Sequence, residues 1–372
     1  MSKFFSVKRD ELFGHLVAMQ PICNKRTALA VTESILFQVS PRELILKATD
    51  LEISLQVSIT TDGSLTEPRS FLINGRRIFE IVRELSGNLS FEIKEHSLEL
   101  EADGGIAFKL AIAEADDFPP FPERIENLMQ FDASFLLGLF NKVAFVVPQN
   151  NANKALNGVL FEADQDGISL VGTDGHSLAR VTTSKYTLAE AQSWLLPRRA
   201  ILELKKIMET GSDTVFVGTC SGQLVFSGAS FNFFSKLLSD KFPEYQSALE
   251  SSDFNAGKFE REALVQSLKR AGCLLAGQFI STSFKFGKKE VDINLENKEV
   301  GSFREKIIPA KYDHTNDIVA RFYSPYLLQG LQAIEDKEMS FFIKNDSRPI
   351  IFKSIQKDYD FTYLVMPVAA QQ

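Results

Sequence analysis

The sequence predicts an α+β chain made of three similar domains in tandem, each with two helices and several strands. Three observations carry this prediction: short motifs recur at a fixed interval, amphipathic helical segments occupy corresponding places in each interval, and runs of alternating hydrophobicity fill the rest. The length of 372 residues agrees, because such a chain is too long for one ordinary core and is typical of two or three domains.

The repeat consists of motifs that recur 124 residues further along the chain. In the first two copies they are Ser34-Ile-Leu-Phe37 and Gly158-Val-Leu-Phe161, Ala48-Thr-Asp50 and Gly172-Thr-Asp174, and Asp117-Phe-Pro119 and Lys241-Phe-Pro243. A third copy is weaker: Thr282-Ser-Phe-Lys-Phe286 takes the place of the Phe161 region, and Met366-Pro367 follows Phe242-Pro243 by the same 124 residues. Several matches in one register are not expected by chance, so we infer an internal repeat.

Each repeat begins with a helix whose apolar residues are spaced three and four apart, expected at 10–22, 133–146 and 262–275. A second helix is expected after an extended segment, at 76–85, 198–208 and 325–334. Alternating runs, the pattern of half-buried strands, surround the second helices; examples are 43–47, 52–57, 90–94, 214–218 and 339–344.

These elements form units of about 120 residues, the usual size of an independent domain. We expect domain 1 at residues 1–124, domain 2 at 129–247 and domain 3 at 248–372. The linkers are expected near 124–128 and 249–254.

Composition limits the class of protein without identifying a function. The chain is 44% apolar and 24% charged, and its 32 phenylalanines are spread through it as core residues would be. The N-terminus lacks the long apolar segment of a signal peptide, and the most apolar helical stretch, 135–147, is too short to span a bilayer. The three cysteines, Cys23, Cys220 and Cys273, have no metal-ligand spacing and indicate reduced thiols in a cytosolic protein.

No catalytic or cofactor motif is present in the sequence: it has no phosphate-binding loop, dinucleotide fingerprint or nucleophile elbow. Asp174, His176 and Ser177 contain the residue types of a hydrolase triad, but triad members normally converge from separate segments, and a turn between two strands is favoured. Asp116-Asp117 resembles half of a metal site, yet no second carboxylate cluster accompanies it, which favours an acidic loop. We therefore expect neither catalysis nor a cofactor or metal.

Positive charge is concentrated on the helices, although the formal net charge is −7. The second helices open with Arg76-Arg77 and Arg198-Arg199, and Lys142 and Lys269-Arg270 lie on first helices. Such residues on one side would bind phosphates without recognising bases. The alternative is a solvated face of mixed charge, since glutamates are interleaved; the equivalent places of Arg76 and Arg198 favour the DNA role.

Simple geometry relates these helices to a ring. Two copies of the chain would supply six domains and twelve helices. Helices packed at ~9 Å would enclose a circumference of ~108 Å, and therefore a ring ~34 Å across at the helix axes and ~24 Å inside them. That hole is at least as wide as a DNA duplex, whereas the helices of one chain could not surround one.

The sequence resembles the β subunit of bacterial DNA polymerase III, the sliding clamp, over essentially its whole length. The motifs that carry the resemblance are Phe5-x-Val-x-Arg-Asp-Glu-Leu12, Ala48-Thr-Asp-Leu-Glu-Ile53, Leu156-Asn-Gly-Val-Leu-Phe161, Gly172-Thr-Asp-Gly-His176, Lys241-Phe-Pro-Glu-Tyr245 and Tyr363-Leu-Val-Met-Pro367. The resemblance implies the DNA clamp fold, with two chains forming a closed head-to-tail ring around duplex DNA. It also implies a processivity role, a clamp loader that opens the ring, and docking of the replicative polymerase, other polymerases and repair proteins through short motifs rich in Gln, Leu and Phe.

The resemblance further implies three sets of site residues. Contact with DNA would involve Arg26, Arg76, Gln149, Lys154 and Arg198. The dimer interface would pair Phe108 and Leu110 of one protomer with Leu274 of the other. The partner pocket would contain Leu156, Thr173, Gly175, His176, Leu178, Pro243, Ala248, Phe279, Tyr323, Tyr326, Leu364, Val365, Met366 and Pro367.

Three departures from the family pattern concern the affinity for partners. Ser177 stands where an arginine often follows the Gly-His pair, Lys154-Ala155 replaces aromatic residues, and the chain continues through 368–372. Two other classes of function remain as alternatives: a processive hydrolase or transferase on a repeated scaffold, and a protein that binds a small ligand in a cleft between repeats. For the pocket, the alternative is that its residues form the core of domain 3.

Overall fold

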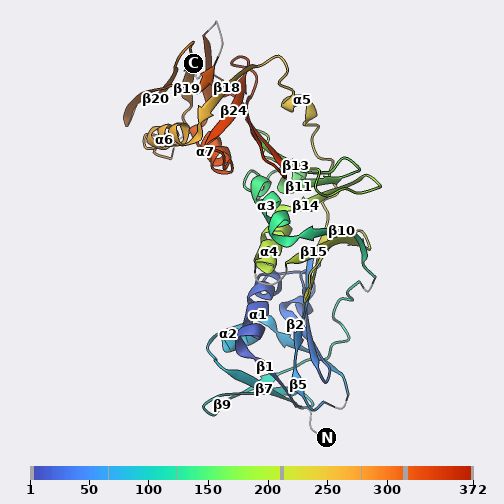
Figure 1. The fold of residues 1–372 in the computed structure, drawn as a ribbon. Coiled ribbons are helices and arrows are strands. Elements are labelled where there is room, and N and C mark those ends of the chain that lie inside the picture. The colour runs from blue at the N-terminus through green and yellow to red at the C-terminus, as the bar shows by residue number, and fades with distance from the viewer. Residues whose placement is uncertain are drawn as a thin grey trace. The chain divides into compact units, whose positions relative to one another are not determined.

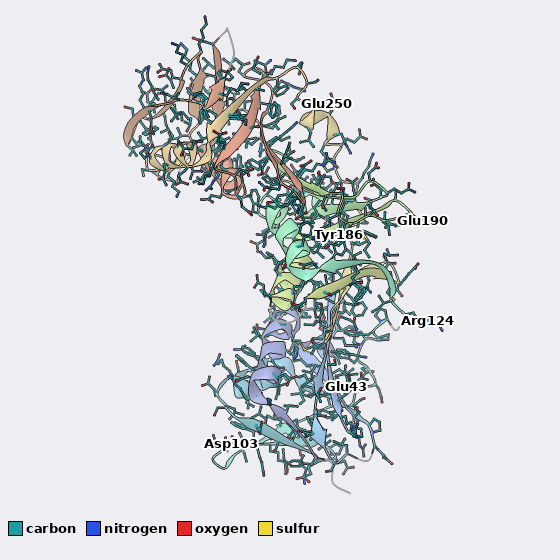
Figure 2. The ribbon with its side chains drawn as sticks, viewed as in Figure 1. Glu43, Asp103, Arg124, Tyr186, Glu190 and Glu250 are labelled. Carbon is teal, nitrogen blue, oxygen red and sulfur yellow. The ribbon has the colours of Figure 1, made fainter. Side chains whose placement is uncertain are left out.

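The structure is a computed structural model that describes residues 4–65, 67–122, 124–209, 213–277, 279–312 and 317–369. The chain divides into two compact units, one of residues 1–137 and 199–237 and the other of residues 138–198 and 238–372. Figure 1 shows the order of the elements along the chain, and Figure 2 marks Arg124 and Glu250 on two connecting segments. Among the described residues, no helix combines the length and apolar character needed to cross a bilayer.

The first unit contains two antiparallel sheets. A five-stranded sheet has the order β5 (Asp62–Gly63), β1 (Phe4–Lys8), β7 (Asn88–Ile93), β8 (Ser97–Ala102) and β9 (Ile106–Ala111). An eight-stranded sheet has the order β10 (Glu126–Asp132), β15 (Thr214–Cys220), β16 (Gln223–Ser227), β17 (Phe231–Lys236), β4 (Ile53–Thr60), β3 (Glu43–Thr49), β2 (Ser34–Val39) and β6 (Arg69–Asn74).

The second unit has the same kind of construction. A nine-stranded sheet has the order β14 (Gln192–Pro197), β11 (Gly158–Ala163), β12 (Ile168–Thr173), β13 (Ser177–Thr183), β26 (Asp360–Val365), β25 (Ile350–Ile355), β24 (Glu338–Ile343), β18 (Asn255–Glu260) and β22 (Lys311–Tyr312). A four-stranded sheet has the order β21 (Gly301–Ile307), β20 (Val291–Asn297), β19 (Thr282–Phe286) and β23 (Ile318–Phe322).

The helices follow the expected pattern of a first and a second helix in each repeat. The first helices are α1 (Arg9–Cys23), α3 (Ala133–Ala144) and α6 (Arg261–Gly272), and the second are α2 (Gly75–Arg83), α4 (Arg198–Met208) and α7 (Ser324–Gln332). Three shorter elements were not expected: α5 (Gln246–Leu249) and the 3₁₀ turns η1 (Ala30–Glu33) and η2 (Lys154–Asn157). The fold is therefore α+β, as predicted.

Apolar spacing fixes which helix face is buried. In α1, Leu12, Leu16 and Met19 are fully buried, and this helix packs on α2 within the first unit (Figure 1). The carboxamide oxygen of Asn74 caps α2 by accepting a hydrogen bond from Arg77 N at 3.1 Å. In the second unit α6 packs on α7 in the corresponding way.

Each unit contains one strand pair that joins two repeats. In the first unit β17, the last strand of the second repeat, pairs antiparallel with β4 of the first repeat, with Phe233 opposite Leu55. In the second unit β26, the last strand of the third repeat, pairs with β13 of the second repeat, with Leu364 opposite Leu178. The repeats are thus joined through continuous sheets as well as by the chain.

Lys142 has a structural role that its sequence pattern did not indicate. Its side chain is only 11% exposed, and Nζ donates to Ala333 O at 2.7 Å and to Glu335 Oε1 at 2.6 Å. Ala333 is the C-terminal cap of α7, so the ammonium neutralises the negative end of that helix. The inclusion of Lys142 among exposed basic charges is corrected accordingly.

Candidate functional site

A tight turn between β12 and β13 is the centre of the proposed partner pocket. Thr173 Oγ1 donates to Ser177 O at 2.6 Å and accepts from Gly175 N at 3.1 Å. Asp174 Oδ1 accepts from His176 N at 2.8 Å, from Ser177 N at 2.6 Å and from Ser177 Oγ at 3.1 Å. Gly175 has φ +89°, a left-handed conformation that a residue without a Cβ adopts without strain.

These bonds decide between the two interpretations of Asp174, His176 and Ser177. The aspartate accepts from two backbone N–H groups and the serine hydroxyl, while the imidazole of His176 stacks on the ring of Tyr326 with centroids 6.1 Å apart. A triad requires the imidazole to lie between the carboxylate and the nucleophile. The cluster is a turn between strands, as the spacing favoured.

The end of the chain forms a wall beside this turn. Met366 N donates to His176 O at 2.8 Å, which extends the β13–β26 pairing by one residue. Leu178 and Leu364 belong to one buried cluster, against which the partly buried Ala248 packs. Phe242 is in the same cluster, and the Pro243 that follows it is exposed. The turn, the last strand and the segment 242–248 therefore meet at one apolar surface.

An aromatic row continues from the turn. Tyr326 stacks on His176 and meets Tyr323 edge-on at 5.2 Å between centroids, and Tyr323 in turn stacks on Phe279 at 4.4 Å. Phe279 is 52% exposed, a high fraction for a phenylalanine. We use the name docking groove below for the apolar surface and this row together, because they coincide with the partner pocket that the sequence resemblance implies.

The fourteen pocket residues named from the sequence differ in exposure. Met366 and Phe279 are exposed large apolar side chains, and His176 is exposed as well. Leu156, Thr173, Leu178, Leu364 and Val365 are buried and support the surface from beneath, while Tyr323, Tyr326 and Pro367 are half-buried. A methyl of Leu156 lies 3.9 Å from where a Cβ on Gly175 would be, which places η2 beside the turn.

Two residues that sequence reasoning missed hold the groove in shape. Tyr363 OH donates to Tyr326 O at 2.7 Å, which fixes the start of α7 to the last strand. Arg321 O accepts from Val368 N at 2.7 Å, which holds the segment after Met366. Tyr363 opens the motif that ends at Pro367, but the motif does not reveal the hydrogen bond of its hydroxyl. The second bond involves only backbone atoms, which no sequence motif records.

Burial and negative charge act on the tyrosines of the groove. Burial raises the pKa of Tyr326, and the nearby Asp174 carboxylate and Tyr323 raise it further. The pKa of Tyr363 is raised mainly by its burial, with Asp174 again adding to the effect. Both phenols are therefore neutral and able to donate hydrogen bonds at physiological pH.

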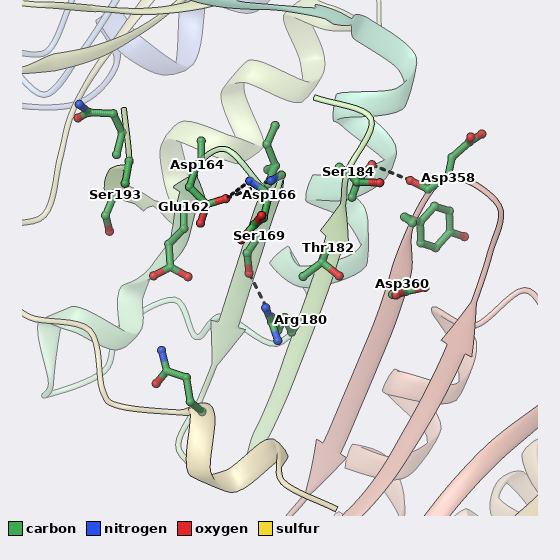
Figure 3. Close-up of a pocket in the computed structure, with 18 of the residues that line it drawn as sticks. Glu162, Asp164, Asp166, Ser169, Arg180, Thr182, Ser184, Ser193, Asp358 and Asp360 are labelled. Carbon is green, nitrogen blue, oxygen red and sulfur yellow. Dashed lines mark hydrogen bonds between the residues drawn. The ribbon is translucent and has the colours of Figure 1, made fainter. Parts of the chain in front are cut away.

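A separate polar cavity lies over the β11–β13 region of the second unit (Figure 3). It has a volume of about 690 Å³, and its lining includes Glu162, Asp164, Asp166 and Arg180. Arg180 Nε donates to Ser169 Oγ at 3.2 Å, and Tyr245 OH donates to Glu162 at 2.8 Å. No group of three or more His, Cys, Asp or Glu within the described ranges could hold a metal ion.

The five residues proposed for DNA contact have different surroundings. Arg26, Gln149 and Lys154 are exposed. Arg76 is 69% exposed at its side chain and forms an ion pair with Glu80, Nε to Oε1 at 2.8 Å. Arg198 is half-buried, and its Nε has no hydrogen-bond partner among the described residues.

Arg199, the neighbour of Arg198, is held by the protein itself. Its guanidinium forms an ion pair with the buried Asp50 and donates to Pro21 O at 3.3 Å. Arg199 is therefore a structural residue of the first unit, and its sequence grouping with the arginines proposed to contact DNA is corrected.

The Asp50 pair predicts a pH dependence of stability. Burial alone would raise the pKa of Asp50, but hydrogen bonds from Ile53 N, Arg199 and Glu52 N outweigh it and hold the pKa below its ordinary value. A depressed folded-state pKa stabilises the fold above the unfolded value, about 3.9, and this contribution is lost as pH falls through the folded pKa. Asp50→Asn should therefore lower the urea midpoint of unfolding at pH 7, and the decrease of this midpoint below about pH 4 should be smaller than in the wild type. Asp164→Asn, in an exposed turn, is the control. An equal decrease of the midpoint at acid pH in wild type and D50N would contradict the assignment.

The three residues proposed for the dimer interface lie on or beside sheet edges. Phe108 and Leu110 are half-buried on β9, which is an edge strand of its sheet. No residue of β9 itself is fully buried. Leu274 follows α6 and packs against the same buried cluster as Phe303 of β21, which is also an edge strand. Each edge thus carries half-buried apolar side chains.

Comparison with known proteins covers nearly the whole chain. Models of the DNA polymerase III beta subunit match residues 3–122 (N-terminal domain), 130–244 (central domain) and 254–369 (C-terminal domain). The beta sliding clamp of Pseudomonas putida is 25% identical over 367 residues, which covers 98% of this chain and 99% of that protein. That of Staphylococcus aureus is 24% identical over 374 residues and covers 98% of each chain.

Solved structures agree on the fold. The Bacillus subtilis sliding clamp matches with a TM-score of 0.91 at 20% identity, and a Pseudomonas aeruginosa clamp bound to griselimycin with 0.90 at 23%; each covers 100% of both chains. The hydrolase and transferase alternatives are set aside. The chain belongs to the DNA polymerase III beta subunit family, and it is a non-catalytic processivity subunit with the three-domain sliding-clamp fold.

Proposed function

We propose that two copies of this chain close head to tail into a ring that encircles duplex DNA in the cytoplasm. The observation that carries this proposal is the pattern of strands that join repeats. The last strands of the three repeats are β9, β17 and β26, and the strands at 53–60, 177–183 and 301–307 are β4, β13 and β21. Within the chain β17 pairs with β4 and β26 pairs with β13, which leaves β9 and β21 as sheet edges.

Pairing β9 of one chain with β21 of the other would repeat the junction already used twice. The five-stranded and four-stranded sheets would become one continuous sheet, comparable with the eight- and nine-stranded sheets inside the chain. Because the two edges belong to opposite ends of the chain, the contact is head to tail, and two such contacts with a rotation that closes give a ring.

We further propose that DNA passes through the ring and is held by charge without sequence readout. Arg26, Arg76, Gln149, Lys154 and Arg198 would contact phosphates, which fix position and carry no base information. The unsatisfied Nε of Arg198 supports this role, since a partly buried guanidinium N–H without a partner is available to a phosphate oxygen.

Combining Arg76→Ala with Arg198→Ala should test both the hole and its charges. We expect the clamp loader to load less of the double variant than of the wild type onto nicked circular DNA of any sequence. The slope of log affinity against log salt concentration should be smaller by about one unit for each lost phosphate contact. Linearising the DNA should release both proteins, because a ring slides off free ends. Lys94→Ala combined with Arg348→Ala, which removes two exposed cations from loops outside these helices, is the matched control. Retention on linear DNA or preference for one sequence would contradict the proposal.

The docking groove is the proposed site for the replicative polymerase, the clamp loader, other polymerases and repair proteins. It would take short segments rich in Gln, Leu and Phe, whose apolar anchors fit a surface formed by the exposed Met366 and Phe279. The buried Leu178 and Leu364 support this surface from beneath. The griselimycin-bound clamp from Pseudomonas aeruginosa supports the presence of a ligand-binding surface on this fold. No cofactor or metal is part of the proposal.

A further inference from the structure

Two turns of the repeat are built from the same hydrogen bonds. In the first unit Leu51 N donates to Thr49 Oγ1 at 3.1 Å, and Glu52 N and Ile53 N donate to Asp50 Oδ1 at 3.0 and 2.8 Å. The turn at 173–177 repeats each of these bonds. In both turns a backbone carbonyl also accepts a hydrogen bond from the end of a repeat's last strand. Lys236 N donates to Glu52 O at 2.9 Å, and Met366 N donates to His176 O at 2.8 Å.

The two aspartates differ in what neutralises them. The second oxygen of Asp50 binds the Arg199 guanidinium, and Lys25 Nζ lies 3.6 Å from it. Asp174 forms no ion pair with any residue in the described part of the chain; its additional partner is the neutral hydroxyl of Ser177, at 3.1 Å from Oδ1. The repeat therefore contains one compensated aspartate and one uncompensated aspartate in the same local structure.

The uncompensated charge lies within the docking groove. Asp174 stands between Thr173 and Gly175 in the turn and is half-buried, and its field acts on Tyr326 and Tyr363. Tyr326 belongs to the aromatic row, and Tyr363 lies beneath it. Apolar surroundings reduce screening by water, so a charge at this place acts more strongly than one on an open surface.

We propose that the groove prefers partner segments that carry a lysine or arginine next to their apolar anchors, with Asp174 as the residue that sets this preference. The partner's cation would pair with Asp174 as Arg199 and Lys25 pair with Asp50. The inference rests on the proposed docking function and adds the charge of the partner to it. An acidic partner segment would instead place two negative charges together in a weakly screened site.

The test uses three labelled peptides in which Gln-Leu-Ala-Leu-Phe is flanked on both sides by Lys, by Ala or by Glu. We expect wild-type protein to bind them in that order, with about tenfold between the Lys and Glu peptides at low salt and less at high salt. Asp174→Asn keeps Oδ1 as the acceptor for the turn and removes only the charge. It should reduce the Lys-to-Glu ratio severalfold, with the Ala peptide measured alongside as the neutral reference.

Two variants separate local charge from other effects. Asp164→Asn removes one charge from a turn of the same type, where Asp164 Oδ1 accepts from Asp166 N at 2.9 Å and Gly167 N at 3.0 Å. It lies at the other end of the six-residue strand β12, about 20 Å away, and should keep the full ratio. Ser177→Ala removes the hydroxyl and keeps the charge, so it should also keep the ratio.

The possible results test the charge preference and the docking groove separately. A ratio that survives in D174N, falls equally in D164N, or favours Glu in the wild type would overturn the charge preference. Failure of the wild type to bind even the Ala peptide would overturn the docking groove itself, which is a different result.

Discussion

Leu274→Asp should convert the protein from a dimer to a monomer at micromolar concentration. Leu274 packs in a cluster with Phe303, beside the β21 edge that we pair with β9 of a second chain. A carboxylate buried there without a partner costs about 3 kcal/mol. Because a two-chain ring contains this contact twice, the cost doubles to about 6 kcal/mol, or about 10⁴-fold in the dissociation constant.

Size exclusion with light scattering measures the native molar mass and so distinguishes monomer from dimer. Ile355→Asp is the matched control, since Ile355 is 78% exposed at the end of β25 and lies outside the proposed interface. Phe108→Asp, on the opposite edge, should give the same monomer and excludes local unfolding around Leu274 as the cause. A dimer that persists in both charged variants would remove β9 and β21 from the interface.

Met366→Ala should weaken binding of a Gln-Leu-x-Leu-Phe peptide by about ten- to thirtyfold, the range of a typical anchor contact. Met366 is 37% exposed, and its backbone is fixed by the bond from Met366 N to His176 O, so truncation removes contact surface without disturbing the strand. Phe279→Ala should weaken binding too, because it shortens the aromatic row.

Titration of the labelled peptide measures the effect, with Ile355→Ala as the control for an exposed apolar side chain outside the groove. Deletion of 366–372, whose residues 370–372 lie outside the described residues, should act in the same direction. Both variants should remain dimeric and load on DNA. Equal affinity in wild type and M366A would exclude the last strand as a wall of the groove.

The helices were predictable because each depends on local spacing. All six expected helices start within one residue of their expected positions, and the helix at 198–208 matches at both ends. The first connector was less predictable: strand β10 begins at Glu126, within the expected linker at 124–128. A register shift between Asn127 and Met129 interrupts the alternation by which a strand is recognised.

Site residues were predictable only where a motif carries them. The turn at Thr173 and Asp174 has such a motif, and the structure shows its hydrogen bonds. The roles of Lys142 and Arg199 could not be inferred, since their partners Glu335 and Asp50 lie 193 and 149 residues away in sequence. Composition showed both as positive charges, and only the fold distinguishes a structural ion pair from a free cation.

The two sheet edges, β9 and β21, have a consequence for the protein before it assembles. An unpaired strand edge is a template on which any extended chain can add, and it is a common starting point for aggregation. Here the edges carry Lys109 on β9 and Arg304 and Lys306 on β21, and an apolar strand that adds there would have to remove water from these charged side chains. The closed dimer would hide both edges, so the chain would be most exposed to misassembly when newly made or when a ring is opened, and lysines at these edges would protect it during those intervals.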